Sequence, residues 1–311
     1  MTKTDPRAAN PTLFDLGRLD SAFAQSGTGR LIGGSHPQVL LGTSAFTAKG
    51  WEGTFYPVGM KAADYLRHYG TRFRTVEIDS TFYGTPQAAR VRAWYEKTPP
   101  NFVFAAKVPQ LITHEKILLD CAPEFTEFLT TMDLLKEKLG PLLLQFGQFS
   151  RYVFRNGQEF LQRLIPFLRK LPADHRFVVE IRNRQWLDAN FLDALREHRV
   201  ALALTDSSWT PRPWDMQGNK QQPLDLITAD FAYVRWLGDR KGIEEVTTRW
   251  DKTVVDRRDD LLHWVKLFRE LVARNLTVFA YANNHYAGNG PGTVKLFWEL
   301  FEEKAPTSKD G

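Results

Sequence analysis

The chain has 311 residues, 43% of them hydrophobic and 25% charged, and its 41 Lys and Arg exceed its 36 Asp and Glu by five. This composition is typical of a globular protein and excludes collagen-like, coiled-coil and wholly disordered classes, and no apolar run approaches the ~20 residues of a membrane-spanning helix. The modest positive charge favours an anionic ligand, but it falls short of the dense Lys and Arg clustering of a dedicated nucleic-acid binder.

The chain begins with a Pro- and Gly-rich stretch, residues 1–37, whose weak periodicity predicts a flexible tail. From residue 39, short runs rich in Val, Leu, Phe and Ala predict strands that are buried on both faces. These runs occupy residues 39–43, 74–79, 102–107, 141–146, 176–182, 200–206, 231–236 and 276–284. Amphipathic patterns predict helices at 61–72, 86–97, 123–138, 158–170, 187–198, 255–274 and 291–304. Residues 207–229 show no periodicity and are expected to form a long loop.

Eight predicted strands alternating with helices indicate a parallel sheet. The number of units and their length favour an α/β fold, the (β/α)8 TIM barrel, as one domain over residues 38–305. The N-terminal tail is then an extension, and residues 306–311 are expected to be disordered. An open doubly wound sheet is the alternative, although no G-x-G-x-x-G motif opens the first crossover.

Polar and charged side chains gather at the C-terminal ends of the predicted strands, where the active sites of TIM barrels lie. They are Glu77, Asp79, Lys107, Gln145, Glu180, Arg182, Asp206, Arg235, Tyr281 and Asn283. Because side chains alternate along a strand, Glu77 shares a face with Asp79, and Glu180 shares one with Arg182. A site at the mouth of the barrel is one interpretation, and buried ion pairs that only support the barrel are the other.

The segment NNHYAGNGPGT, residues 283–293, leads from the last predicted strand into the last helix. Gly290 and its neighbouring glycines would let N–H groups converge on an anion at the helix N-terminus. Arg235, Arg240 and Lys241 would add positive charge to such a pocket. An ordinary turn is the alternative.

The small numbers of cysteine and histidine residues limit the metal sites and disulfides that the chain can form. The single Cys121 excludes an internal disulfide and a multi-cysteine site, and most of the seven histidines fall far from the predicted mouth. We therefore expect either no cofactor or a divalent metal held by Glu77, Glu180 and Asp206. The polar N-terminus and the low cysteine content favour a cytoplasmic location.

Five segments resemble the motifs of one known family. They are GTSAFTAKGWEGTFYP (42–57), VEIDSTFYGTP (76–86), FAAKVPQLITHEK (104–116), PLLLQF (141–146) and VVEIRNRQW (178–186). In this order they resemble the YecE-like family, domain of unknown function number seventy-two, over residues 39–303. The resemblance implies a TIM barrel without supplying a reaction.

The resemblance also implies a set of recurrent residues. They fall on Thr43, Ser44, Trp51, Glu77, Ser80, Thr81, Phe82, Tyr83, Lys107, Thr113, His114, Gln145, Glu180, Arg182, Trp186, Asp206, Arg235 and Asn283. Ala45 and Phe46 stand where the family usually has Gly-Trp, and Leu237 stands where many members have His. A reaction that required this histidine would be missing here.

The first functional hypothesis is an acid–base enzyme acting on an anionic or phosphorylated, sugar-like small molecule. Glu77 or Glu180 would be the general base, with Asp206 as a third carboxylate. Lys107 and Arg235 would stabilise negative charge. The reaction class stays open between isomerase, lyase and hydrolase.

Other residues complete this hypothetical site. Tyr83 and His114 would donate protons or bind substrate, and the remaining substrate ligands would be Ser44, Trp51, Gln145, Arg182, Trp186, Arg235, Tyr281, Asn283 and Gly290. A desolvated Lys107 could form a Schiff base, but pairing with nearby carboxylates is expected to keep it a protonated electrostatic group.

Two other functions remain open. A barrel that binds nucleic acid or cleaves phosphodiesters is one, by analogy of fold alone. A non-catalytic ligand-binding protein is the other, and Leu237 gives it weight.

Overall fold

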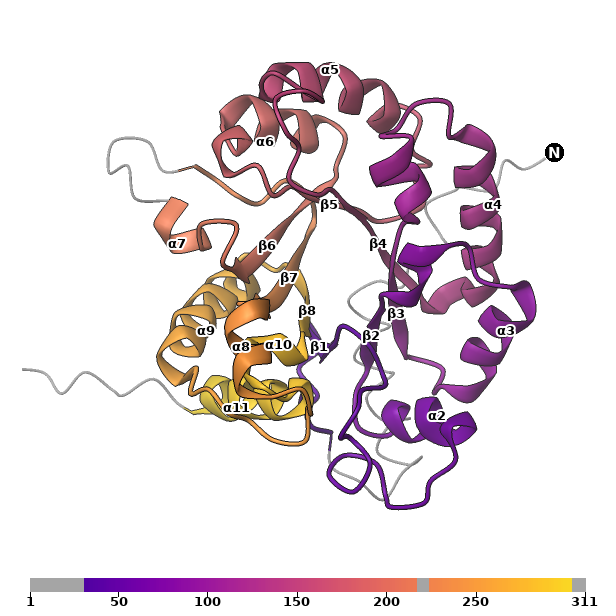
Figure 1. Ribbon diagram of the computed structural model, residues 1–311, viewed down its shortest axis with the longest axis vertical. Coiled ribbons are helices and arrows are strands. Elements are labelled where there is room, and N and C mark those ends of the chain that lie inside the picture. The colour runs from indigo at the N-terminus through magenta and orange to yellow at the C-terminus, as the bar shows by residue number, and fades with distance from the viewer. Residues whose placement is uncertain (1–30, 217–223, 304–311) are drawn as a thin grey trace, which may run out of the picture.

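Eight parallel strands form the wall of a nearly closed barrel, with helices around its outside (Figure 1). The computed structural model describes residues 31–216 and 224–303. The strands are β1 (Val39–Thr43), β2 (Thr75–Ile78), β3 (Val103–Lys107), β4 (Leu139–Gln145), β5 (Phe177–Glu180), β6 (Ala201–Ser207), β7 (Phe231–Gly238) and β8 (Thr277–Ala282). Hydrogen-bonded neighbours follow the order β1-β8-β7-β6-β5-β4-β3-β2. The predicted single-domain, TIM-barrel-like fold is confirmed.

The helices lie close to their predicted positions. They are α2 (Tyr65–Gly70), α3 (Ala88–Lys97), α4 (Ala122–Met132), α5 (Gly157–Leu168), α6 (Ala189–Glu197), α7 (Pro213–Met216), α8 (Arg240–Val246), α9 (Arg258–Ala273), α10 (Asn284–Ala287) and α11 (Gly290–Glu302). Short turns η2 (Ala62–Asp64), η3 (Ser80–Tyr83), η4 (Leu111–Glu115), η5 (Asp133–Lys138) and η6 (Arg184–Trp186) complete the elements. No helix in the described ranges is both long and apolar enough to cross a membrane.

Four helical segments differ from the prediction. The expected helix at 123–138 is divided into α4 and η5, where Lys136 has a positive φ of 51°. The helices α8 and α10 were not predicted, because each has seven residues or fewer and is too short to show a hydrophobic period. The expected loop at 207–229 holds α7, and its residues 217–223 lie outside the description.

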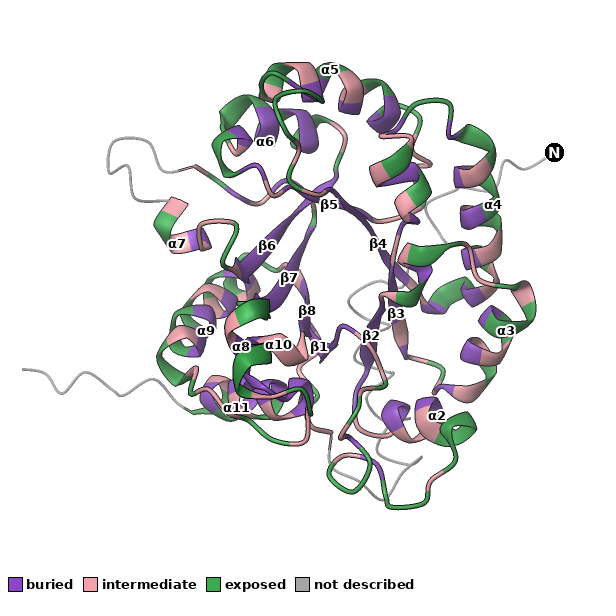
Figure 2. Ribbon diagram, viewed as in Figure 1, coloured by how far each residue is buried: buried purple, intermediate pink, exposed green. Residues whose placement is uncertain are grey.

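Side chains alternate along each strand between the barrel interior and the face covered by helices. The interior cluster consists of Leu40, Ala105, Leu143, Val178, Ala201, Ala203, Phe231, Tyr233, Phe279 and Tyr281. On the other face, the helices bury their inner sides and expose their outer sides (Figure 2). Lys107, Gln145, Glu180 and Arg235 each lie two residues beyond a member of the interior cluster. The alternation therefore brings these four to the C-terminal mouth of the interior.

β1 and β2 stand at the two ends of the order of hydrogen-bonded strands and share no backbone ladder. Side chains join these two strands instead. At this β1–β2 seam, the Tyr69 hydroxyl from α2 accepts a hydrogen bond from the Thr43 N–H at 2.9 Å and donates to the Thr75 carbonyl oxygen at 3.2 Å. Gly42 lies so close to β2 that an added Cβ would stand 2.1 Å from the Thr75 oxygen. The seam thus needs a tyrosine on one side and a glycine on the other.

The described part of the N-terminal segment contacts the barrel. The Ile32 N–H donates to the Arg72 carbonyl oxygen at 2.9 Å, and the His36 ring meets the edge of Phe301 from α11. Gly34 lies against the ring of Trp298. Residues 1–30 of the predicted tail and the predicted disordered residues 306–311 lie outside the described residues.

Candidate functional site

Arg235 is the centre of a buried charged cluster at the mouth of the barrel. Its side chain comes from β7 and is 2% exposed. Its Nε and Nη2 atoms donate to the two oxygens of Glu77 at 2.9 and 2.8 Å, and its Nη1 donates to Glu180. Burying these charges is costly and is offset only by close, well-directed hydrogen bonds, which the planar guanidinium supplies. Arg235 thereby ties β7 to β2 and β5.

Further donors occupy the remaining positions on the two carboxylates. The Tyr233 hydroxyl donates to Glu77 Oε2 at 2.6 Å, and Gln145 Nε2 donates to Glu180 Oε1 at 2.8 Å. Burial raises the pKa of Glu180, but Arg235 and Arg182 outweigh it and hold that pKa below its ordinary value. Burial and the nearby Glu77 raise the pKa of Tyr233 well above its ordinary value, so this hydroxyl stays protonated.

Lys107 reaches into the same mouth without an ionic partner. No carboxylate of a described residue lies within 4.0 Å of its Nζ atom, which stands 5.6 Å from the centre of the Phe82 ring. Burial, followed by the charge of Arg235, lowers the pKa of Lys107. From the sequence, we expect Lys107 to pair with nearby carboxylates. That expectation is wrong, because Arg235 takes both Glu77 and Glu180.

His114 follows β3, and its ring lies against Phe82, as the Lys107 amine does. Its Nδ1 shares a hydrogen bond of 2.8 Å with the Thr113 hydroxyl, and its ring meets the edge of Phe82. Burial and the positive charges of Arg182 and Lys107 lower the pKa of His114. The imidazole is therefore neutral at pH 7.

Arg182, which acts on Glu180 and His114, and Asp79, which acts on Lys107, are the other charged groups of the mouth. The Arg182 guanidinium lies 4.3 Å from the ring centre of Trp209, and its Nε atom is 3.7 Å from Glu180. This buried Nε has no hydrogen-bond partner among the described residues. Burial raises the pKa of Asp79, although Lys107 opposes the shift.

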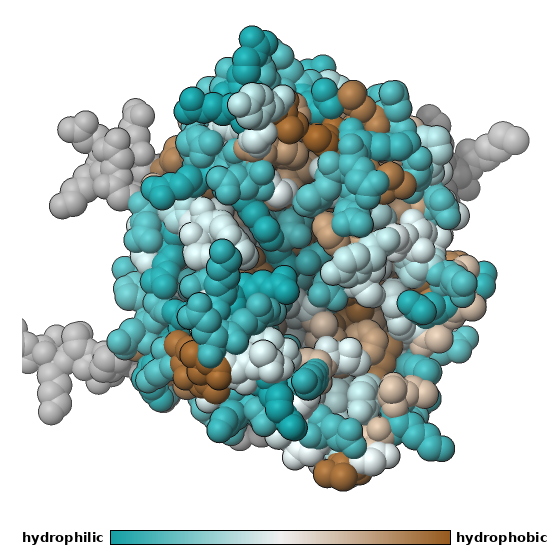
Figure 3. Space-filling model, viewed as in Figure 1, coloured by the Kyte–Doolittle hydropathy of each residue, from teal (hydrophilic) through white to brown (hydrophobic). Residues whose placement is uncertain are grey.

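Seen in the direction of Figure 3, hydrophilic residues surround the hollowed centre of this face. Ser44 and Asn283 stand at the ends of β1 and β8, where Asn283 Nδ2 donates to the Ser44 hydroxyl at 3.0 Å. Leu237 lies two residues beyond Arg235 in β7 and is buried. Strand alternation puts Leu237 on the interior face, so an apolar side chain stands where the resemblance would place histidine.

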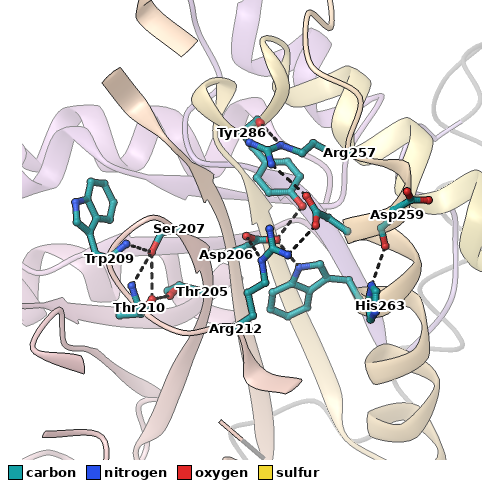
Figure 4. A network of polar contacts seen from close by, with 12 residues as sticks. Thr205, Asp206, Ser207, Trp209, Thr210, Arg212, Arg257, Asp259, His263 and Tyr286 are labelled. Atoms are coloured by element: carbon teal, nitrogen blue, oxygen red, sulfur yellow. Dashed lines mark hydrogen bonds and ion pairs between the residues drawn. The ribbon is translucent and has the colours of Figure 1, made fainter. Parts of the chain in front are cut away.

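Asp206 does not join the other two carboxylates. Ala201 and Ala203 of β6 face the interior, so Asp206 points to the outer face, towards α9 and α10. Its oxygens accept from Tyr286 at 2.9 Å, Trp264 at 3.0 Å and Arg212 at 3.1 Å (Figure 4). The predicted metal site of three carboxylates is therefore wrong, and no group of three metal-ligating side chains occurs in the part of the chain that the structure describes.

Several predicted ligand-binding aromatics are enclosed or lie away from the cluster. The indole of Trp51 is buried and donates to Asn284 at 3.2 Å. Tyr281 is buried and shares a hydrogen bond of 2.8 Å with Thr75. Trp186 packs among buried phenylalanines, and Tyr83 is 78% exposed. Packing accounts for the first three, and Tyr83 stands on the outer rim.

The glycine-rich segment forms α10 and the start of α11, and its amides are already occupied. The Gly290 N–H donates to the Asn284 side-chain oxygen at 2.8 Å, and the Gly292 N–H donates to that of Asn289 at 2.6 Å. The Gly288 N–H donates to the Asn284 carbonyl oxygen at 2.7 Å. The predicted anion pocket is therefore wrong, because the chain's own asparagines bind the groups that an anion would need.

Sequence reasoning missed Tyr233 and Trp209. Tyr233 lies two residues before Arg235, and this spacing on one strand was the available signal. Trp209 lies in the long segment after β6, where the sequence offers no period that would place its ring over Arg182.

Comparisons with known proteins agree with the fold. The family model described as "Protein of unknown function DUF72" matches residues 40–310. "UPF0759 protein YunF" of Bacillus subtilis (strain 168) is 25% identical over 267 residues, 81% of this chain and 93% of that protein. "UPF0759 protein YecE" of Escherichia coli (strain K12) is 34% identical over 121 residues, 39% of this chain. The match spans 42% of that relative, less than half its length. The solved structure of a DUF72 family protein from Thermotoga maritima has a TM-score of 0.65 at 24% identity, covering 86% of this chain and all of that one.

Proposed function

The chain belongs to the DUF72 family, and from the geometry of its barrel mouth we propose that it is an acid–base enzyme acting on an anionic, sugar-like small molecule. One observation carries the proposal. The two buried carboxylates, Glu77 and Glu180, are both bound by Arg235, whereas the Lys107 amine beside them has no ionic partner among the described residues. A ligand that enters the mouth therefore meets unpaired positive charge.

The free donors favour a planar or tetrahedral anion. Lys107 offers a compact ammonium group, and Arg182 offers a partly exposed guanidinium next to Glu180. Carboxylates and phosphates match these donors, because both accept charge-assisted hydrogen bonds at short distances. The half-exposed face of Trp209 and the neutral groups of Ser44 and Asn283 suit the apolar faces and hydroxyls of a sugar.

Proton transfer is assigned to groups whose pKa moves towards neutrality. Burial raises the pKa of Asp79 and lowers that of Lys107. Such opposed shifts in one site yield an acid and a base at working pH. Glu77 and Glu180 are then positioning residues, because their oxygens are held by Arg235. This assignment favours an isomerase or a lyase, in which proton removal beside a carbonyl group is the central step.

The test is ligand-dependent thermal stabilisation. We expect glucose 6-phosphate to raise the melting temperature of the full chain and glucose to have no effect, since a ligand at 100 times its Kd stabilises by about 2.7 kcal/mol. In Lys107→Met, about ten times more glucose 6-phosphate should be needed for the same rise in melting temperature. Lys295 is an exposed lysine on α11, and Lys295→Met should respond like the wild type.

Two results would refute this function. Equal stabilisation by glucose and its phosphate would remove the anionic requirement. Equal losses of stabilisation by glucose 6-phosphate in Lys107→Met and Lys295→Met would show that the ligand responds only to the overall positive charge. Stronger stabilisation by a single-stranded oligonucleotide than by the sugar phosphate would favour the nucleic-acid alternative.

A further inference from the structure

We propose that Lys107 forms a covalent imine with the carbonyl carbon of an anionic, open-chain aldehyde or ketone bound in the mouth. The inference rests on the proposed function, because it takes from it an anionic ligand in this site. It goes further by naming the substrate class and by assigning a covalent step to one residue.

The Lys107 amine is available for reaction. An amine attacks a carbonyl carbon through its lone pair, so an ammonium group held by carboxylates is unreactive. In this mouth, Arg235 binds Glu77 and Glu180 through three of its nitrogen atoms. Lys107 is left with no carboxylate of a described residue within 4.0 Å. Arg235 therefore occupies both glutamates, so that neither of them forms an ion pair with Lys107.

Another buried lysine of the same chain serves as a comparison. Lys138 is 4% exposed, and burial lowers its pKa as well. Its Nζ, however, donates to the carbonyl oxygens of Tyr95 and Thr98 and to the Thr98 hydroxyl. Those acceptors fill its hydrogen-bonding capacity and turn it away from any ligand. Burial alone does not make a lysine reactive, and the absence of acceptors separates Lys107 from Lys138.

The electric field around Lys107 also bears on its reactivity. Burial and Arg235 lower its pKa, and the carboxylates of Glu77, Asp79 and Glu180 oppose them without reversing the shift. A larger share of the side chain is then neutral at pH 7 than for an exposed lysine. A second cation beside a desolvated amine is a recognised way to activate a lysine for Schiff-base formation.

The groups around the amine can complete the step with atoms and charges balanced. The Lys107 nitrogen forms a bond to the carbonyl carbon, and the carbonyl π pair moves to oxygen. Neutral His114 carries one proton from this nitrogen to that oxygen, which gives a carbinolamine. Asp79, whose pKa is raised, then protonates the hydroxyl, the C–O bond breaks and water leaves. The nitrogen lone pair closes the C=N bond, leaving a protonated imine and an Asp79 carboxylate.

The imine explains why such a lysine would serve an isomerase or a lyase. A protonated C=N group withdraws electrons more strongly than the carbonyl it replaces. It thereby eases removal of a proton, or cleavage of a C–C bond, at the neighbouring carbon. The guanidinium of Arg182, whose side chain is 28% exposed beside Glu180, provides a cation for the anionic end of the same substrate.

The experiment is reductive trapping on the full-length chain. Dihydroxyacetone phosphate is the anionic probe, dihydroxyacetone the neutral one, and sodium cyanoborohydride reduces any imine to a stable secondary amine. Peptide mapping by mass spectrometry then locates the adduct. We expect Lys107 to be labelled roughly tenfold faster at pH 7 than exposed Lys295, with the anionic probe favoured over the neutral one.

Two variants and one competitor sharpen the result. Lys107→Arg keeps the positive charge and should abolish the adduct, with its circular dichroism showing that the barrel is folded. Lys138→Met removes the fully bonded lysine and should leave the labelling pattern unchanged. Inorganic phosphate should slow labelling of Lys107 and leave that of Lys295 unaffected.

Labelling of Lys107 no faster than of Lys295, or no adduct at Lys107, would overturn the imine. Stabilisation by phosphate is measured on the same samples, so the two proposals fail separately. Stabilisation without an adduct refutes the imine and keeps the anion site. Absence of both refutes the anion site as well.

Discussion

Removal of Arg235 should destabilise the barrel more than removal of any exposed cation. Arg235→Met keeps much of the side-chain volume and deletes the guanidinium. It leaves the carboxylates of Glu77 and Glu180, which are 0% and 3% exposed, without their shared counter-ion. Breaking a buried pair on one side costs about 3–5 kcal/mol. Since folded domains are stable by about 5–15 kcal/mol, the variant should lose roughly a fifth or more of its free energy of unfolding.

The pH dependence of this loss has a defined sign. In the wild type the pKa of Glu180 is lowered, so its stabilisation is present above the ordinary carboxyl pKa and is lost as pH falls through the lowered value. In Arg235→Met, Arg182 and Gln145 still lower the pKa of Glu180, but the largest charge that opposes burial is gone, so this pKa should rise above its wild-type value. Protonation of Glu180 then stabilises the variant. The difference between its free energy of unfolding and that of the wild type should therefore shrink as pH falls from 7 to 5.

The assay is urea unfolding at pH 7 and pH 5, followed by tryptophan fluorescence. The triple variant that adds Glu77→Gln and Glu180→Gln should recover much of the lost stability, because it removes the orphaned charges. Arg240→Met, which breaks an exposed pair with Glu244, is the matched control and should unfold like the wild type. A loss below about 1 kcal/mol, or a deficit that grows on acidification, would refute the reasoning.

Three further predictions concern the wall of the barrel. Gly42→Ala should cost about 1–3 kcal/mol, because its Cβ would stand 2.1 Å from a carbonyl oxygen of β2, whereas Gly147→Ala meets its nearest neighbour at 3.4 Å. Equal urea midpoints for the two would contradict this close approach. Tyr69→Phe leaves the Thr43 N–H without its acceptor and should cost roughly 1–3 kcal/mol, with faster hydrogen exchange at that amide as the readout. Unchanged exchange would argue against closure by side chains. Asp206→Asn should lower the melting temperature without changing phosphate binding, and weaker binding would place Asp206 in the site.

The barrel was predictable because each strand is a continuous apolar run bounded by polar residues. Because these runs are continuously apolar, they do not reveal whether a residue faces the barrel interior or the helices. In the run at 200–206, VALALTD, positions on both faces are apolar, so no alternation reveals that Ala201 and Ala203 point inwards and Asp206 outwards. Only the pairing with neighbouring strands determines which of these residues point into the barrel. The sequence therefore predicts that charges stand at strand ends and leaves open which of them meet.

The glycine-rich segment shows the opposite limitation. Its glycines drew attention to free amides, but Asn284 and Asn289 stand in the same eleven residues. Asparagine is a favoured helix cap, and here both side chains bind amides at the start of α11. Weighing the asparagines as caps would have predicted an internally satisfied turn. The pairing of Arg235 with two glutamates needed three-dimensional contacts between β2, β5 and β7, which no local pattern contains.

The β1–β2 seam closes the wall in a way that the other intervals do not. In a fully laddered barrel, backbone hydrogen bonds fasten every adjacent pair of strands. Here the Tyr69 hydroxyl bonds the Thr43 N–H of β1 and the Thr75 carbonyl oxygen of β2, so a side chain of α2 takes the place of backbone hydrogen bonds. Closure of this wall therefore depends on the placement of one helix as well as on the order of the strands.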